Sequence, residues 1–190
     1  MFKQILFLVS LFCLLSSTSF ARSTHNISVG VMGMGNIQLL DVNPEINIGP
    51  GGGMYFDYRF NQRFSLTLDA WGTIHSGTGA SSGDGGIALL GIPTATIKMY
   101  FMDDEASKWD PYAGLGIGAY AITGSDAVGA NGLGLGAQIE VGFDYLISDS
   151  FSVGFAGVFR SAGIITGLSG NNSATAIIPF SLAGKAAYHF

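Results

Sequence analysis

Eight charged residues stand at alternate positions within segments that are otherwise apolar. Alternate residues of an extended strand point to the same face, so these charges would share one face. Four are acidic and four are basic, and equal numbers of opposite charges suit a closed interior in which each ion needs a partner. We therefore predict an interior charge network with a structural role; the functional alternative is a gated ion path along Lys98, Glu140, Arg160 and Lys185. The eight are Asp57, Arg59, Asp69, Lys98, Glu140, Asp144, Arg160 and Lys185.

Three other patterns suggest chemistry but fail on spacing. His75 and Ser76 follow Asp69 and could act as the base and the nucleophile of a lipid-modifying enzyme. However, nothing in the spacing supplies the third group that orients the base. The run 103–105 is acidic, which is typical of a solvated turn more than of a cation site. The glycines of 33–35 and 132–136 lack the full spacing of a phosphate loop. We therefore predict no enzymatic activity, cofactor or metal, with no catalytic residue.

The composition indicates a protein whose outer surface does not face water. Only 11% of its 190 residues are charged, against roughly 25% in soluble domains, while 48% are hydrophobic and 29 are glycine. This combination excludes an intrinsically disordered chain, since disorder goes with low hydrophobicity and high charge. With 8 Lys and Arg and a pI near 4.9, the chain also has no basic surface for nucleic acid.

The first 21 residues have the pattern of a secretory signal peptide. Lys3 precedes the apolar stretch Ile5–Leu15, and small residues, Ser19 and Ala21, stand at the positions that a signal peptidase reads. A membrane anchor is the alternative, but the stretch is shorter than the ~20 residues that a spanning helix needs. Lipoprotein processing at Cys13, the only cysteine, is disfavoured by the bulky residue before it. We predict cleavage after residue 21 and one barrel domain over 22–190.

Eight segments alternate apolar residues with small or polar ones, which is the pattern of β-strands. The apolar face carries no charge in any segment, and a mid-bilayer Lys or Arg would cost about 2–4 kcal/mol there. The pattern predicts an all-β protein: an eight-stranded antiparallel up-and-down transmembrane β-barrel, with a bulge or rim near Pro93. The segments are Ile27–Met34, Gly53–Phe60, Phe64–Ile74, Ile87–Phe101, Tyr112–Ile122, Leu133–Tyr145, Phe151–Arg160 and Ile178–Phe190.

The connections and the glycines favour a membrane barrel over a soluble one such as a lipocalin. Connections at 61–63, 102–110 and 147–150 are short or medium, whereas those at 38–52, 75–86, 124–131 and 161–174 are long, as in outer-membrane barrels. A soluble barrel would need many more charges on its outer face. Aromatic residues gather near the short turns, where an interfacial girdle is expected. Inner-face glycines would make room for bulky side chains in a filled core: Gly114, Gly116, Gly118, Gly134, Gly136 and Gly142.

Two segments carry a family resemblance. The last strand, Pro179–Phe190, ends in Tyr-His-Phe, and the segment 110–118 reads DPYAGLGIG. With the eight-strand pattern over Ile27–Phe190, the chain resembles the small outer-membrane β-barrel proteins of Gram-negative bacteria, the OmpA/OmpX-like and porin-family group. The resemblance implies a place in the outer membrane and an assembly signal read by the barrel-assembly machinery, but no wall-tethering domain. That signal would comprise Leu182, Gly184, Ala186, Tyr188 and Phe190.

The sequence therefore predicts an integral outer-membrane barrel with a side-chain-filled interior, serving envelope structure or surface interaction. Its expected partners are outer-membrane lipids and the assembly machinery, with no nucleic acid; an extracellular partner is unidentified. Outer loops carry recognition when a scaffold is rigid, which makes Pro44, Glu45, Asp84 and Asn171–Asn172 the exposed candidates. The alternative function is a narrow channel or carrier for small or apolar solutes.

Overall fold

The structure is a computed structural model that describes most of the predicted barrel domain. The described residues are 26–39, 45–46, 48–75, 77–78, 87–102, 107–124, 131–166 and 173–190. The predicted signal peptide 1–21 with Cys13, the acidic run 103–105 and Ser76 lie outside them. So do the loop candidates Pro44, Asp84, Asn171 and Asn172.

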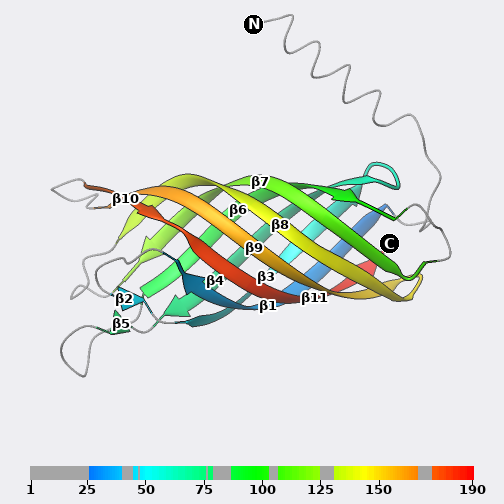
Figure 1. The fold of residues 1–190 in the computed structure, drawn as a ribbon, viewed down its shortest axis with the longest axis horizontal. Helices are drawn as coiled ribbons and strands as arrows, with labels where there is room; N and C mark the ends of the chain where they lie inside the picture. The colour runs from blue at the N-terminus through cyan, green and yellow to red at the C-terminus, as the bar shows by residue number, and fades with distance from the viewer. Residues whose placement is uncertain are drawn as a thin grey trace, which may run out of the picture.

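Antiparallel strands wind around a single closed barrel (Figure 1). β10 and β11 are two parts of one barrel strand, interrupted at Ile178, so the barrel has eight strands, as predicted. Two short strands, β2 (Glu45–Ile46) and β5 (Gly77–Thr78), pair with each other beyond one end of the barrel. The barrel strands are β1 (Ile27–Gln38), β3 (Gly49–Arg59), β4 (Phe64–His75), β6 (Ile87–Tyr100), β7 (Trp109–Thr123), β8 (Gly132–Ser148), β9 (Phe151–Thr166), β10 (Ser173–Ile177) and β11 (Pro179–His189).

The first and last strands close the barrel. β1 pairs with β11 from Ser28 opposite His189 to Gln38 opposite Pro179, and every other barrel strand pairs with its sequence neighbours. Closure leaves no sheet edge, which satisfies backbone hydrogen bonds in surroundings that offer none. We name the end with the connections 60–63 and 149–150 the short-turn end, and the opposite end, where β2 and β5 lie, the loop end.

The predicted irregularity near Pro93 is confirmed. The pairing of β6 with β7 shifts between Gly91 and Thr94. As a result, two consecutive residues, Ile92 and Pro93, lie on the outer face, with Ile92 58% exposed. Leu89 and Thr94 on either side of the shift both point inward and are buried.

Several strands extend further than the sequence suggested. β3 begins at Gly49 and β9 continues to Thr166, in regions where the abundance of glycine predicted long loops. For β3 the reason is packing inside the wall. A Cβ at Gly49 would lie 2.5 Å from the His75 ring, and one at Gly53 would lie 2.7 Å from the Trp71 Cβ. Glycine at these positions leaves room for bulky side chains of the next strand, as the inner-face glycines were predicted to do.

The two faces of the wall differ as predicted. The outer face exposes aliphatic side chains, with Ile117 71% and Leu135 76% exposed, whereas the charged residues on strand interiors turn inward. Aromatic rings cluster on the outer face at the short-turn end. There the centre of the Trp109 ring lies 4.8 Å from that of Phe143 and 5.2 Å from that of Tyr145. Such a ring of aromatics is typical of the boundary between hydrocarbon and water.

Candidate functional site in the barrel lumen

The centre of the lumen is occupied by an ion pair with an aromatic partner. Lys185 Nζ of β11 lies 2.9 Å from Glu140 Oε1 of β8, and their side chains are only 5% and 8% exposed. Tyr112 of β7 donates its hydroxyl proton to the same carboxylate oxygen over 2.5 Å, and Lys185 also contacts this hydroxyl. Because three strands supply these groups, the cluster ties opposite parts of the wall together.

A second buried pair joins β3 to β6. Lys98 Nζ lies 3.5 Å from Asp57 Oδ1, and Lys98 is 2% exposed. The hydroxyls of Ser65 and Thr67 donate to the same Asp57 oxygen, at 2.9 Å for Ser65. The Lys98 ammonium also lies 4.8 Å from the centre of the Tyr112 ring, a cation–π contact that helps to offset its desolvation.

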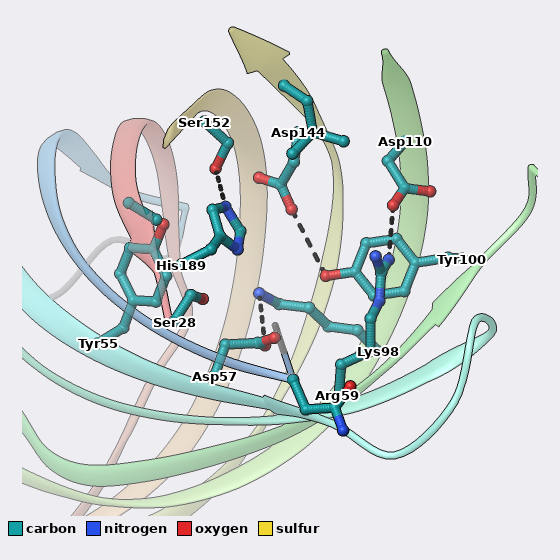
Figure 2. Close-up of a pocket in the computed structure, with 13 residues that line it drawn as sticks. Ser28, Tyr55, Asp57, Arg59, Lys98, Tyr100, Asp110, Asp144, Ser152 and His189 are labelled. Carbon is teal, nitrogen blue, oxygen red and sulfur yellow. Dashed lines mark hydrogen bonds and ion pairs between the residues drawn. The ribbon is translucent and has the colours of Figure 1, made fainter. Parts of the chain in front are cut away.

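The short-turn end of the lumen opens into a polar cavity (Figure 2). Arg59 Nη2 lies 2.6 Å from Asp110 Oδ2, and its guanidinium stacks 3.7 Å from the centre of the Tyr100 ring. Tyr100 directs its hydroxyl to Asp144 over 3.5 Å, and His189 contacts Ser152. The cavity measures about 40 Å³, enough for a few water molecules.

Asp110 is a member of the network that the sequence analysis missed. We had placed this residue in a connection, but it lies in β7 and is 2% exposed. Asp110 stands two residues before Tyr112 and therefore points to the same inner face. Extending the predicted strand by two residues would have included it. With Asp110, the inward-facing set has five acids and four bases in the described strands.

Asp69 and Arg160 are held by neutral partners. Asp69 accepts a hydrogen bond from the Thr94 hydroxyl. Arg160 donates to Gln138 Oε1 at 3.1 Å and to Ser181 Oγ at 2.7 Å, and its guanidinium stacks 4.2 Å from the Trp71 ring. Of the eight predicted charges, therefore, four form two ion pairs with each other, Arg59 pairs with the unpredicted Asp110, and three rely on hydroxyl, amide or aromatic groups.

Beyond Arg160, toward the loop end, the lumen holds an apolar cluster beside the buried polar residues Asn36, Thr73 and His75. Trp71 packs edge-on against Tyr120 with ring centres 6.1 Å apart, and both are at most 3% exposed. Inward-facing aliphatic side chains of β1, β6, β7, β9 and β10 fill the space around them. The alternation placed Trp71 and Tyr120 on the inner face and predicted a filled interior, but it did not predict that an apolar cluster would gather at this end. The plug comprises Met34, Trp71, Ile87, Leu89, Tyr120, Ile122, Ala162, Ile164, Ile177 and Ala183.

The geometry around His75 gives no sign of catalysis. His75 is 1% exposed at the loop end of β4, where its Nε2 lies 3.0 Å from Thr73 Oγ1. Thr73 in turn accepts a hydrogen bond from Asn36 at 3.2 Å. Asp69, which precedes His75 on β4, accepts a hydrogen bond from Thr94. Within the described ranges, no group of three or more His, Cys, Asp or Glu is placed to hold a metal ion.

The residues of the predicted assembly signal lie on the outer face of β11 and its end. Leu182, Tyr188 and Phe190 are 46%, 51% and 60% exposed, and the last two rings pack edge-to-face at 5.0 Å. Gly184 is exposed and Ala186 half-buried on the same face. Their signalling role remains a prediction. In the part of the chain that the structure describes, no helix is long and apolar enough to cross a membrane.

Comparison with known proteins relates this geometry to a family. The family model for the outer membrane protein beta-barrel domain matches residues 5–173. No curated protein matches the chain.

Solved structures share the fold at low sequence identity. Neisserial surface protein A is 14% identical with a TM-score of 0.69, covering 87% of this chain and 97% of its own. OprG of Pseudomonas aeruginosa is 17% identical with a TM-score of 0.58, covering 90% and 99%. Outer membrane protein W of E. coli is 17% identical with a TM-score of 0.54, covering 90% and 100%. The chain belongs to the outer membrane protein beta-barrel domain family and is an integral protein of the Gram-negative outer membrane.

Proposed function

We propose that this protein is a closed, non-enzymatic barrel that serves envelope structure and holds its outer loops at the cell surface. One observation carries the proposal: toward the loop end the lumen is occupied by the apolar plug around Trp71 and Tyr120 and by the buried Asn36, Thr73 and His75 beside it. A path for ions needs polar groups or water along its whole length, because an unpaired ion in apolar surroundings is costly.

The charged half of the lumen also supports a closed interior. Its cavity at the short-turn end is about 40 Å³, and a second cavity beside Arg160, Lys98 and Glu140 is about 20 Å³. Each has room for one to a few water molecules. Lys185 and Lys98 stand between the two ends of the lumen with their ammonium groups engaged by carboxylates and tyrosine rings.

The alternative, a narrow channel or carrier for small or apolar solutes, requires the plug to move. Trp71 and Leu89 are 3% and 1% exposed and come from adjacent strands, so a passage would need several side chains to leave their positions together. Close-packed interiors resist such changes.

Single-channel recording in planar bilayers tests the proposal. The wild-type barrel is expected to give no conductance steps. Any steps are expected to be more frequent in a barrel with both Trp71→Ala and Leu89→Ala, because two side chains of the plug are shortened while the charged half stays occupied. Heat-modifiable migration on gels verifies that both proteins are folded. Steady steps from the folded wild-type barrel would overturn the closed-barrel proposal in favour of a channel.

A further inference from the structure

An apolar groove runs along the outer face of the barrel near the loop end. Its volume is about 710 Å³, far larger than either cavity in the lumen. It spans β6, β7, β8 and β9, and its described side chains include none with a charge. The main lining residues are Ile92, Ala119, Ala121, Leu133, Leu135 and Ile165.

The groove lies between two ridges of larger side chains, with small residues on the strand between them. The bulge in β6 places Ile92 on the outer face, and on β8 the exposed Leu133 and Leu135 form the opposite ridge. Between them β7 carries Ala121 opposite Leu133 and Ala119 opposite Leu135. Strands lie about 4.8 Å apart, so the two ridges are separated by about 10 Å with small side chains between them. That width admits one extended hydrocarbon chain.

A second group of small residues lies on the opposite wall of the barrel. Gly33 of β1 pairs with Gly184 of β11, and a Cβ at either position would have no atom within 4 Å. Side chains can therefore be enlarged at these two positions without a clash, on a wall away from the groove.

The position of the groove indicates which molecule fills it. It is continuous with the lipid-facing surface of the barrel, which is already an interface with hydrocarbon. Leu133 and Ile165 lie next to the loop-end limits of β8 and β9, and outer-membrane barrels place their long loops outside the cell. The groove thus faces the outer leaflet, whose lipid in Gram-negative bacteria is the glycolipid lipid A.

We infer that the groove binds one acyl chain of lipid A. No hydrophobic effect separates protein from lipid within a bilayer, so the preference comes from van der Waals packing. A rigid groove surrounds the chain on several sides with atoms at fixed positions, which gives more contacts than mobile neighbouring chains do. Straight, saturated chains gain most from this arrangement.

Lipid retention measured by native mass spectrometry tests the inference. The intact barrel is reconstituted in nanodiscs of phosphatidylcholine with a small fraction of lipid A, then released and weighed. The double variant Ala119→Leu with Ala121→Leu fills the groove and is expected to lower the lipid A retained at least fivefold. The control, Gly33→Leu with Gly184→Leu, adds somewhat more bulk on the opposite wall and is expected to change retention less than twofold.

Three outcomes would overturn the inference. Equal retention by the groove variant and the wild type would place the lipid elsewhere. Equal retention of phosphatidylethanolamine in place of lipid A would remove the assignment to the outer-leaflet lipid. A dimer in the wild type that the groove variant loses would assign the groove to a second copy. Heat-modifiable migration verifies folding of each variant, and the conductance test of the lumen is independent of all three.

Discussion

The two halves of the lumen are closed by different physical means. Toward the short-turn end, pairs such as Lys185–Glu140 and Arg59–Asp110 cross from strand to strand, and cavities remain between them. Toward the loop end, Trp71, Leu89 and their neighbours fill the space with apolar groups. The charged half depends on distances between particular atoms, whereas the apolar half depends on volume.

This difference shows how a barrel wall of uniform pattern can enclose two environments. Along β7, the residues that point into the lumen change from one end to the other. Asp110 and Tyr112 come first, glycines follow, and Tyr120 and Ile122 come last. The outer face is apolar throughout, because lipid surrounds all of it. Only the inner face is free to vary, so the closure of each half is encoded there.

Removing one partner of the central ion pair should have the largest effect. Glu140→Ala leaves Lys185 buried without its carboxylate, and breaking a buried pair in this way costs about 3–5 kcal/mol of unfolding free energy. Urea titration of the folded barrel, followed by its heat-modifiable gel band, measures the loss. The double variant Glu140→Leu with Lys185→Met removes both charges and is expected to lose much less. Equal losses in the two variants would show that the pair itself does not account for the effect.

The fold was predictable because its signal repeats in every strand. Alternation requires only that one face be apolar, and the absence of charge on that face distinguished lipid from water. The ends of strands were less predictable. Near Gly49 and in β9 beyond Arg160, glycine indicated loops, yet both segments are strands. At Gly49 glycine suits the strand because the neighbouring His75 ring needs the space. That requirement lies in the partner strand and cannot be read locally.

For the charges in the lumen, the sequence indicated which residues point inward better than it indicated which of them pair. The inward phase identified all eight charges, but which ones meet depends on register between strands, as for Lys98 and Asp57. Arg160 illustrates the limit, because its partners are Gln138, Ser181 and the Trp71 ring and none is an acid. A filled interior was predicted, with Trp71 and Tyr120 on the inner face, but the apolar cluster that they form with residues of β1, β6, β9, β10 and β11 was not, because it depends on how the strands meet.

A cavity in the apolar half should cost somewhat less than an unpaired charge. Leu89 is 1% exposed inside the plug, and Leu89→Ala is expected to lower the unfolding free energy by about 2–4 kcal/mol through lost contacts and the space left behind. Leu90→Ala is the matched control: the same strand and residue type, but on the lipid face, where acyl chains can fill the gap. The same urea titration compares them. Equal losses would mean that the plug is not tightly packed.

The smallest effect is expected at the short-turn end of the lumen, where Arg59 pairs with Asp110; we call this place the mouth. The Arg59 side chain is 18% exposed, so water and salt screen its pair with Asp110 more than they screen Lys185–Glu140. Arg59→Ala should cost about 1–2 kcal/mol, from the lost pair and the lost contact with the Tyr100 ring. A double-mutant cycle of Arg59 and Asp110, measured at low and high salt, isolates the pair. The coupling should shrink as salt rises, while that of Lys185 and Glu140 stays constant, because ions in solution reach the mouth and not the centre. A coupling at the mouth that resists salt would mean that the short-turn end is as closed as the rest of the lumen, and the contrast between an accessible mouth and a sealed centre would be lost.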